Sequence, residues 1–530
     1  MDCSVPLKKY WLIALLLTVF FVQSFTFITS TSATFDEVQN YGMGKYLLQK
    51  QKWDVMGSIM NPPLVYYLNS LPLLFYAEDK TFWEYKEVSR DLTFLAAVDA
   101  FRGQGLLSGS PNAGDRLLVL SRLMTLMVSL LLGYYIYRFS SELHGTQAGI
   151  LSLFLFAFCP NMLAHSGLIT TDMPFTVFSF IAVYYFWSFL QKQTFTASLP
   201  AAVSLGLALA TKFTALLLIP FLLGIYVFYQ YSEKKRVSSQ IIILFGAAAL
   251  LFMASYGFNL EPFFQGNEHR LTQIGEGFST FLHGNYSGHG WWYFYPVVFL
   301  LKTPLPLLLL FMVASFSFWQ SRRENRFTIL LLFLPIAALF VVFSGSNVSV
   351  GLRYLLPIYP FIFVIIGRLA LSGAGIRKVL YISAVWYVGG TLLIAPHYLA
   401  YFNEIVGGAG NGYKYLVDSN LDWGQDLKGL KKYMEAQGIK RISLSYFGID
   451  APGRYGIDYD WLPSHHLYNP SPDKPVDSVK NRFVAISATN LQGVYLQPRD
   501  MYSWLRNYEP VAKIGYSIFV YDLTALVPVK

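Results

Sequence analysis

Apolar runs of about 20 residues recur from Lys9 to about Pro396, and each is long enough to cross a bilayer as a helix. This repetition constrains the fold more than any other feature of the chain. Only 13% of the 530 residues are charged, whereas about a quarter is usual in soluble proteins. The sequence therefore predicts a mainly α, polytopic transmembrane protein.

About eleven spans are expected, near residues 10–29, 116–138, 147–166, 173–190, 197–211, 213–231, 239–257, 294–318, 327–344, 354–370 and 378–395. With a cytoplasmic N-terminus, most loop lysines and arginines fall inside, including those in 233–236 and 322–326, as the positive-inside rule requires. The C-terminus then lies outside. Lys212 either breaks a long apolar run into two helices or sits within one tilted helix, which would reverse every later orientation.

The chain divides into a membrane part, residues 1–396, and an extra-membrane part, residues 397–530. Within the first part, residues 30–115 form a long outer loop with helical stretches. The tail alternates between helical and strand-like segments, such as "KKYMEAQG" and "RISLSYFG". This alternation predicts a small C-terminal α/β domain.

The net charge of +9 does not indicate a nucleic-acid partner, because the basic residues stand at the ends of apolar runs instead of clustering on one face. Topology signals and contact with membrane lipid account for them. The two cysteines, Cys3 and Cys159, exclude a disulfide framework and a cysteine-based zinc site.

Two adjacent acids, Asp36 and Glu37, follow the first span directly, and Asp172 opens a later one. Each acid has a structural alternative, because carboxylates at a helix start favour the helix dipole. A carboxylate at a hydrophobic boundary is also suited to act as a general base. These three acids are the candidate catalytic residues.

Four cations belong to the same outer boundary: Arg122, Lys212, Lys302 and Arg353. A cation inside an apolar run is costly and usually has a partner or a function. Snorkelling or interfacial anchoring remains the alternative, above all for Lys302 and Arg353. We expect these cations to bind a phosphate group.

The histidines His269, His283 and His289 lie in the second outer loop, residues 258–293. Their spacing matches no helical pair of metal ligands, so loop packing is favoured. No cofactor is specified, and a divalent metal stays open. His289 and Asn61 are candidate contacts of the acceptor.

A base beside phosphate-binding cations suits the transfer of a sugar from a lipid phosphate to a hydroxyl or an amine. The chain has no P-loop or dinucleotide fingerprint, which agrees with a donor other than a nucleotide. A transporter or flippase of a polyprenyl-linked substrate is the alternative, and it predicts discontinuous helices in paired halves.

Several motifs resemble those of the GT-C integral-membrane glycosyltransferases, in the branch of the protein O-mannosyltransferases and the lipid A aminoarabinose transferase. They are "TFDE" after the first span, "NPPLVYYL" at 61–68, the segment 121–145, "GLITTDMP" at 167–174 and "GLALATKFTALLLIP" at 206–220. The resemblance implies a multi-pass GT-C fold. It also implies an inverting transferase that takes its sugar from a polyprenyl phosphate.

For single residues, the resemblance implies that Asp36 is the catalytic base and Glu37 its neighbour, with Asp172 as a second acid of the site. Arg122 matches the arginine in the second span of the family, and Lys212 matches the family's lysine near the donor phosphate.

Arg353 is assigned more loosely. Asn61 departs from the His or Lys that usually precedes Pro-Pro in the family. The chain lacks the large inserted domain of eukaryotic O-mannosyltransferases, which implies a bacterial plasma-membrane enzyme with a periplasmic site. Its acceptor is a protein, a glycan or a lipid.

Three tail acids, Asp418, Asp422 and Asp426, recur at a spacing of four in "DSNLDWGQD". Such a spacing puts them on one helix face if the helix begins that early. A solvated face is the favoured interpretation, and contact with the acceptor is the alternative.

Overall fold

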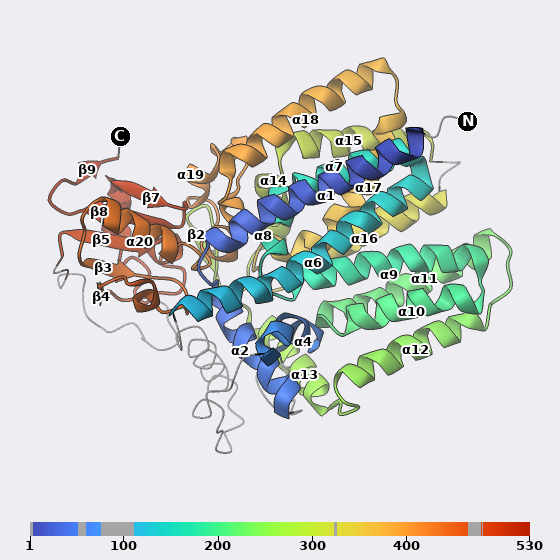
Figure 1. Ribbon diagram of the computed structural model, residues 1–530, viewed down its shortest axis with the longest axis horizontal. Coiled ribbons are helices and arrows are strands. Elements are labelled where there is room, and N and C mark those ends of the chain that lie inside the picture. The colour runs from blue at the N-terminus through green and yellow to red at the C-terminus, as the bar shows by residue number, and fades with distance from the viewer. Residues whose placement is uncertain are drawn as a thin grey trace.

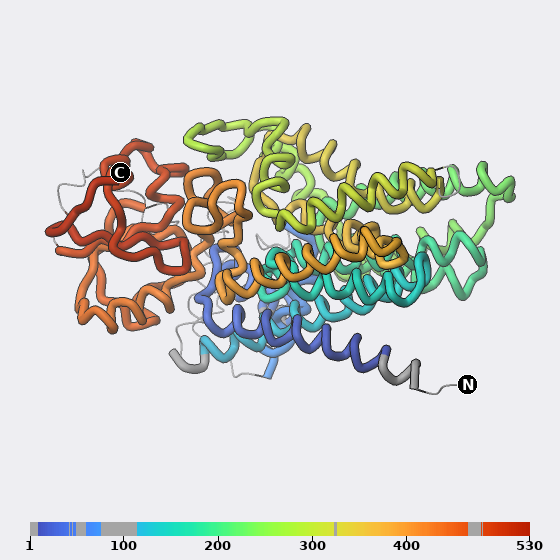
Figure 2. Tube along the Cα trace, turned by 90° about the horizontal axis from the view of Figure 1, so that it is seen from above, coloured from blue at the N-terminus to red at the C-terminus, as the bar shows by residue number. Residues whose placement is uncertain are grey.

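A computed structural model describes residues 4–50, 60–75, 111–322, 326–464, 479 and 481–529. Much of the expected outer loop 30–115 therefore lies outside the described residues. The helices form an elongated bundle, the N-terminus lies at one end, and the C-terminal domain lies beyond the other end (Figure 1). Figure 2 shows the same arrangement from above.

The bundle is built from helices that follow the apolar runs. They are α1 (Ser4–Ser30), α6 (Pro111–His144), α7 (Thr146–Ala157), α8 (Pro160–Ser166), α9 (Asp172–Lys192), α10 (Phe195–Leu209), α11 (Leu218–Ser232), α12 (Gln240–Ser255), α14 (Phe294–Lys302), α15 (Leu305–Gln320), α16 (Arg326–Ser344), α17 (Tyr359–Gly367) and α18 (Ala374–Ile394). Shorter helices lie at the end that faces the C-terminal domain: α2 (Phe35–Lys50), α4 (Leu64–Ser70) and α13 (Glu261–Glu276).

Within the described residues, six helices are long and apolar enough to cross a membrane, and eight if each of two bent pairs is one span. The pairs are α7 with α8, bent by 66°, and α14 with α15, bent by 112°. Prolines explain both bends, because Pro160 starts α8 and Pro304 precedes α15. The predicted spans 197–211 and 239–257 correspond to the shorter apolar helices α10 and α12.

The expected break at Lys212 is present. Lys212 has an extended backbone, with φ −156° and ψ 143°, between α10 and the 3-10 helix η3 (Phe213–Leu217) that precedes α11. The alternative of one continuous tilted helix through Lys212 is therefore wrong.

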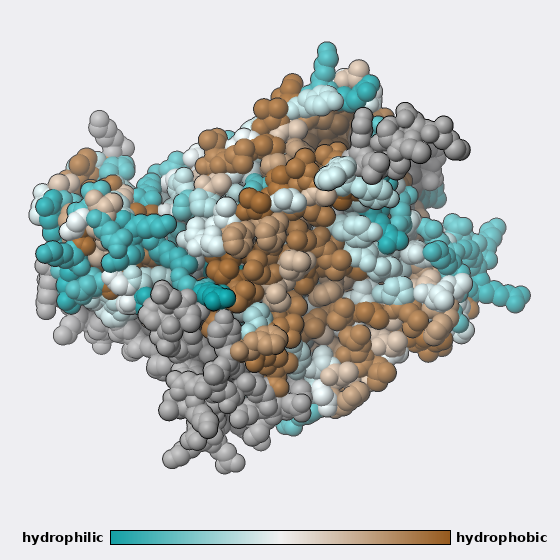
Figure 3. Space-filling model, viewed as in Figure 1, coloured by the Kyte–Doolittle hydropathy of each residue, from teal (hydrophilic) through white to brown (hydrophobic). Residues whose placement is uncertain are grey.

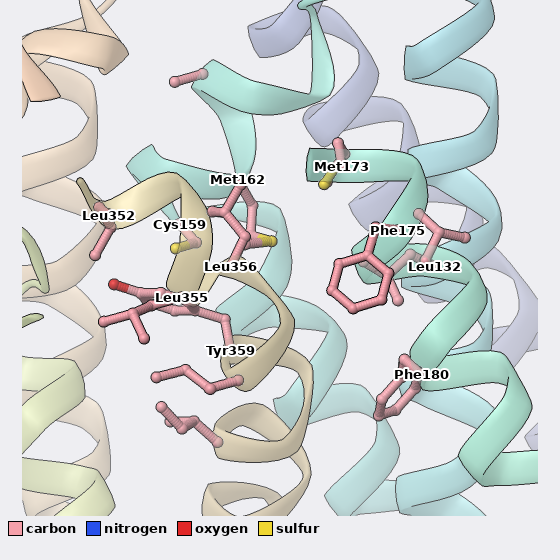
Figure 4. Packing of buried hydrophobic residues seen from close by; sticks show 14 of the residues in the cluster. Leu132, Cys159, Met162, Met173, Phe175, Phe180, Leu352, Leu355, Leu356 and Tyr359 are labelled. Carbon is pink, nitrogen blue, oxygen red and sulfur yellow. The ribbon is translucent and has the colours of Figure 1, made fainter. Parts of the chain in front are cut away.

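Apolar side chains cover the middle of the helical region, and hydrophilic residues gather at its two ends, on the face shown in Figure 3. Inside, one large apolar cluster joins most of the helices. Figure 4 shows part of it, where Leu132, Met162, Phe175, Leu355 and Tyr359 come from α6, α8, α9, the 3-10 helix η4 (Leu352–Ile358) and α17. This core holds together the helices whose ends carry the polar residues.

A mixed five-stranded sheet forms the centre of the tail, with the strand order β4-β3-β5-β8-β7. Its strands are β3 (Ile442–Ser445), β4 (Tyr459–Trp461), β5 (Phe483–Ser487), β7 (Ala512–Ile514) and β8 (Ile518–Asp522). β3 is parallel to β4 and β5, whereas β8 is antiparallel to β5 and β7. The helix α20 (Leu427–Ala436) shares an apolar cluster with β3 and β8, so the predicted α/β character of the tail is confirmed.

The remaining short elements connect these parts. They are β1 (Thr280–Leu282), β2 (Asn285–Ser287), β6 (Tyr508–Glu509), β9 (Val527–Pro528), α19 (Ala409–Gly412), α21 (Ala488–Leu491) and the 3-10 helices η1 (Leu71–Phe75), η5 (Arg368–Leu371), η6 (Tyr398–Ala400), η7 (Glu404–Val406), η8 (Asp418–Asn420), η9 (Pro452–Tyr455) and η11 (Ser503–Asn507). The β1–β2 hairpin docks on the tail, because the His283 backbone N–H donates to the carbonyl of Tyr415, 3.0 Å away.

The contact between α17 and α7 depends on a glycine. A Cβ built on Gly367 would overlap Ser152 Oγ and lie 2.9 Å from the backbone carbonyl oxygen of Ala148. Gly246 on α12 offers a control, because a Cβ there meets nothing within 4 Å.

We expect Gly367→Ala to destabilise the protein by about 1–3 kcal/mol, because an added methyl group overpacks this helix contact. Gly246→Ala should be neutral or stabilising by about 0.5–1 kcal/mol, since alanine favours the helix. Thermal unfolding of both variants in detergent measures the difference. Equal melting temperatures would contradict the close contact.

Candidate active site

A pocket of about 390 Å³ lies at the end of the bundle that faces the C-terminal domain. It is called the main pocket below. Its lining comes from α2, the start of α9, the break at Lys212, the helix α13, the loop around Arg353 and the tail. Segments that lie hundreds of residues apart in the sequence therefore share one concave site.

Four of the predicted site residues meet in the main pocket as one ion cluster. Lys212 Nζ lies 2.5 Å from Asp172 Oδ1, and Arg353 Nη1 lies 2.6 Å from Asp36 Oδ2. Arg353 Nη1 is also 3.6 Å from the other oxygen of Asp172. The cluster thus alternates two acids with two cations, and Arg353 connects both acids.

Aromatic rings hold the two cations in place. Lys212 Nζ lies 4.0 Å from the ring centre of Tyr354, and the Arg353 guanidinium lies 4.5 Å from that of Trp423. Such contacts stabilise a partly desolvated cation. Both cations are consequently fixed in place at the pocket wall.

Asp36 and Glu37 point in different directions, because successive residues of a helix are about 100° apart. Asp36, with a third of its side chain exposed, lines the main pocket. Glu37 is fully buried, and its Oε2 accepts from the backbone N–H and the hydroxyl of Thr34 at 2.8 and 3.0 Å, so it stabilises the start of α2. The structural alternative, in which an acid stabilises the start of a helix, therefore applies to Glu37.

Arg122 is the partner of Glu37. Its Nε and Nη2 donate to the two oxygens of Glu37 at 2.8 and 2.6 Å. The remaining N–H groups donate to carbonyls of the chain just before α2, at Ile28, Thr31 and Ser32. Because Arg122 is completely buried and does not line the main pocket, its placement does not support the predicted contact with phosphate.

Lys302 is also away from the main pocket. Its ammonium donates to the carbonyls of Leu399 and Asn420 at 2.9 and 2.5 Å, and it lies over the ring of Phe402. The side chain thus joins the end of α14 to the start of the tail. It does not support the predicted phosphate contact either.

Only one of the two predicted acceptor residues lies in the main pocket. Asn61 lines the main pocket, with its Nδ2 3.4 Å from Tyr66 Oη. His289 is exposed after β2 and is not among the residues that line the pocket. His283 instead stacks on Tyr415 at 4.6 Å, and no group of three or more His, Cys, Asp or Glu in the described part of the chain is placed to hold a metal ion.

The tail supplies pocket residues that the sequence motifs did not identify: Trp423, Phe447 and Tyr495. Phe447 stacks between Phe35 and Tyr495, at centroid distances of 5.5 and 5.7 Å. The backbone N–H of Phe35 also donates to the carbonyl of Trp423 at 2.8 Å. The start of α2, which carries Asp36, is thus packed against the tail.

The solvated face predicted for the three tail acids is wrong. α20 begins only at Leu427, so Asp418, Asp422 and Asp426 precede the helix. Asp422 and Asp426 are buried, whereas Asp418 lines the main pocket. Asp418 therefore lines the pocket from a short turn ahead of α20, and not from a helix face shared with the other two acids.

Burial changes the acidity of these tail carboxyls. It raises the pKa of Asp418 above its usual range, and it raises the pKa of Asp422 to about 8. Asp422 Oδ2 accepts from the Thr489 backbone N–H at 2.8 Å, while its Oδ1 is buried without a hydrogen-bond partner among the described residues. Asp422 is consequently a neutral structural acid at neutral pH.

Residues 114–256 match the family model of the dolichyl-phosphate-mannose-protein mannosyltransferases. The matched segment contains Arg122, Asp172 and Lys212. No curated protein sequence matches the chain.

Several solved structures resemble nearly the whole chain, and they include structures of two different proteins. One is ArnT from Cupriavidus metallidurans bound to undecaprenyl phosphate, with 13% identity, a TM-score of 0.51, and coverage of 96% of this chain and 97% of that one. The other is the oligosaccharyltransferase of Archaeoglobus fulgidus, with 11% identity, a TM-score of 0.46, and coverage of 95% and 73%. The first likeness confirms the predicted fold.

We expect Arg122→Leu to lower the free energy of unfolding by about 3–5 kcal/mol, because it leaves Glu37 as an unpaired buried charge. Arg138→Leu is the matched control. It breaks the exposed pair between Arg138 and Glu142, which contributes less than about 1 kcal/mol. Thermal unfolding in detergent compares the two, and equal losses would contradict the structural assignment of the Glu37–Arg122 pair.

Stability should fall as the pH rises toward 8, because Asp422 has a pKa of about 8 when folded but an ordinary value of 3.8 when unfolded. The stabilisation from the protonated Asp422 carboxyl is fully present below its pKa in the unfolded chain. It is lost as the pH rises through its pKa in the folded protein. Asp422→Asn cannot titrate, so its melting temperature should fall less between about pH 5 and pH 9. Parallel curves for the two proteins would refute this assignment, and Asp500→Asn, at an exposed position of the tail, serves as the control.

Proposed function

We propose that the chain is an integral-membrane glycosyltransferase of the GT-C class, and that it moves a sugar from a polyprenyl phosphate to an acceptor hydroxyl in the main pocket. The observation that carries this proposal is the ion cluster, in which a pocket acid, Asp36, lies beside two cations, Lys212 and Arg353. The carboxylate of Asp36 suits deprotonation of the acceptor hydroxyl, and the two cations suit the phosphate of the donor.

Lys212 and Arg353 bind the donor phosphate. Both line the pocket, and Arg353 has a buried Nε without a hydrogen-bond partner among the described residues. A buried donor of this kind favours an anionic acceptor group. Asp172 pairs with both cations and so orients them toward the phosphate.

An apolar groove of about 280 Å³ fits the lipid part of the donor. It is lined by residues that stand a few positions after members of the ion cluster in the sequence: Phe175 after Asp172, Thr214 after Lys212, and Pro357 after Arg353. Because its walls belong to α9, η3, α11, α16 and α17, the groove lies within the helical bundle. A polyprenyl chain in this groove would bring its phosphate to Lys212.

Asp36 acts as the general base. It takes the proton of the attacking hydroxyl as the hydroxyl oxygen forms a bond to the anomeric carbon. The bond between that carbon and the phosphate oxygen breaks, and its electron pair leaves with the polyprenyl phosphate. Lys212 and Arg353 stabilise the charge on this leaving group, and attack opposite to it inverts the anomeric carbon.

Glu37 and Arg122 are positioning residues in this mechanism. They fix the turn between α1 and α2, and therefore the place of Asp36, without contact with the substrate. The site faces the periplasm of a bacterial plasma membrane, with the N-terminus in the cytoplasm. The separation of the N-terminus and the tail at opposite ends of the bundle supports this topology.

We expect Asp36→Asn to lower the rate of sugar transfer by about 100-fold or more, because the amide cannot accept the proton. The variant should still bind undecaprenyl phosphate, whereas Lys212→Ala should not, since it removes a phosphate contact. Transfer is followed as release of undecaprenyl phosphate from a panel of labelled undecaprenyl-phosphate sugars in proteoliposomes. Binding is followed as the rise in melting temperature on addition of undecaprenyl phosphate.

Lys192→Ala is the matched control, because Lys192 is exposed in the last turn of α9, far in the sequence from its pocket end. Near-normal sugar transfer by Asp36→Asn would show that Asp36 is not the general base. Movement of the labelled lipid across the bilayer without cleavage would instead favour the transporter.

A further inference from the structure

Asp418 is a pocket carboxylate to which the proposed transfer assigns no task. It reaches the main pocket from the tail, at the start of η8. Its φ of +55° lies in the left-handed region, which costs energy for a residue other than glycine. Strain of this kind persists only where surrounding contacts impose it, and it clusters at functional sites.

The surrounding contacts are strong at Asp418. Its backbone N–H donates to Thr489 Oγ1 at 3.0 Å. Two residues on, the side chain of Asn420 accepts from the Leu352 N–H at 3.0 Å, and its carbonyl accepts from Lys302. The turn is thus fastened both to the sheet domain and to the loop that carries Arg353.

The carboxylate itself is held in a fixed direction. Oδ2 accepts from Tyr495 Oη and Oδ1 from the Ser419 N–H, each at 2.5 Å. Each carboxylate oxygen can accept about two hydrogen bonds, so both keep capacity for a ligand. The charged groups that face Asp418 are Arg353 and Asp36, and Tyr495 is its titratable partner.

Asp418 belongs to the side of the pocket that the donor lipid does not use. The apolar groove is lined by Phe175 and Thr214, which follow Asp172 and Lys212 in the sequence. Asp418 instead accepts from Tyr495, which stacks on Phe447, and Phe447 stacks on Phe35, the residue before Asp36. A molecule that approaches Asp36 from the tail therefore passes Asp418.

We propose that Asp418 binds the acceptor and that the acceptor is a carbohydrate. One hydroxyl of the sugar ring attacks and gives its proton to Asp36, while a neighbouring hydroxyl donates to Asp418. A sugar ring supplies both hydroxyls at short range, whereas a serine or threonine side chain supplies only one. This assignment rests on the proposed function and adds the class of the acceptor.

Asp418→Asn is the test variant, because asparagine tolerates a positive φ and so preserves the turn. With a labelled undecaprenyl-phosphate sugar as donor, transfer to methyl glycosides is compared with hydrolysis by water. We expect the variant to lower the ratio of transfer to hydrolysis at least tenfold, mainly through a higher KM for the glycoside. Tyr495→Phe, which releases one oxygen of Asp418, should give a smaller fall in the same ratio.

Asp500→Asn, at an exposed position of the same domain, is the control and should keep the wild-type ratio. An unchanged ratio in Asp418→Asn would overturn the assignment, and so would an equal loss of transfer and hydrolysis, which places Asp418 with the donor. Transfer by the wild type to threonine peptides but not to glycosides would overturn the carbohydrate acceptor alone. Failure of the wild type to cleave any undecaprenyl-phosphate sugar would instead contradict the proposed function itself.

Discussion

The buried ion pair between Glu37 and Arg122 is the interaction on which the site depends. A guanidinium without contact with water needs a partner for every N–H, and here Glu37 and the carbonyls of residues 28–32 provide them. These bonds fix the turn at which the chain leaves α1 and begins α2. Since Asp36 stands directly before Glu37, the pair also fixes the direction in which Asp36 faces the pocket.

Interruptions in the helices bring Lys212 and Arg353 to the same pocket as Asp36. The chain leaves helical geometry at Lys212, and 3-10 geometry surrounds Arg353, so both cations project from irregular backbone at the ends of apolar segments. Irregular backbone near lipid needs internal partners for its polar groups. The carbonyl of Ala210 accepts from the Leu64 N–H at the start of α4, and the Leu352 N–H donates to Asn420 of the tail. The ion cluster forms where these segments converge.

The tail acts as a wall of the pocket and is not a separate appendage. Trp423 covers Arg353, and Phe447 packs against Phe35 at the start of α2 and carries Tyr495 on its other face. Asp418 adds a third acid to the pocket. Lys302, which looked like a phosphate contact in the sequence, fastens this wall to the membrane part. The location of Asp418 at this junction puts a carboxylate of the tail in the same pocket as Asp36.

The sequence by itself determined the membrane class, the break at Lys212, the α/β tail and the acids and cations that could form a site, because hydropathy and rare charges in apolar runs are local signals. Only the tertiary structure decided which charges meet. Arg122 and Lys302 carry the same sequence signal as Lys212 and Arg353, yet they pair with a buried acid or with carbonyls instead of the pocket. The difference depends on side-chain direction and on contacts across hundreds of residues, which also placed Asp418 and Tyr495 beside Asp36. No local pattern encodes such distances.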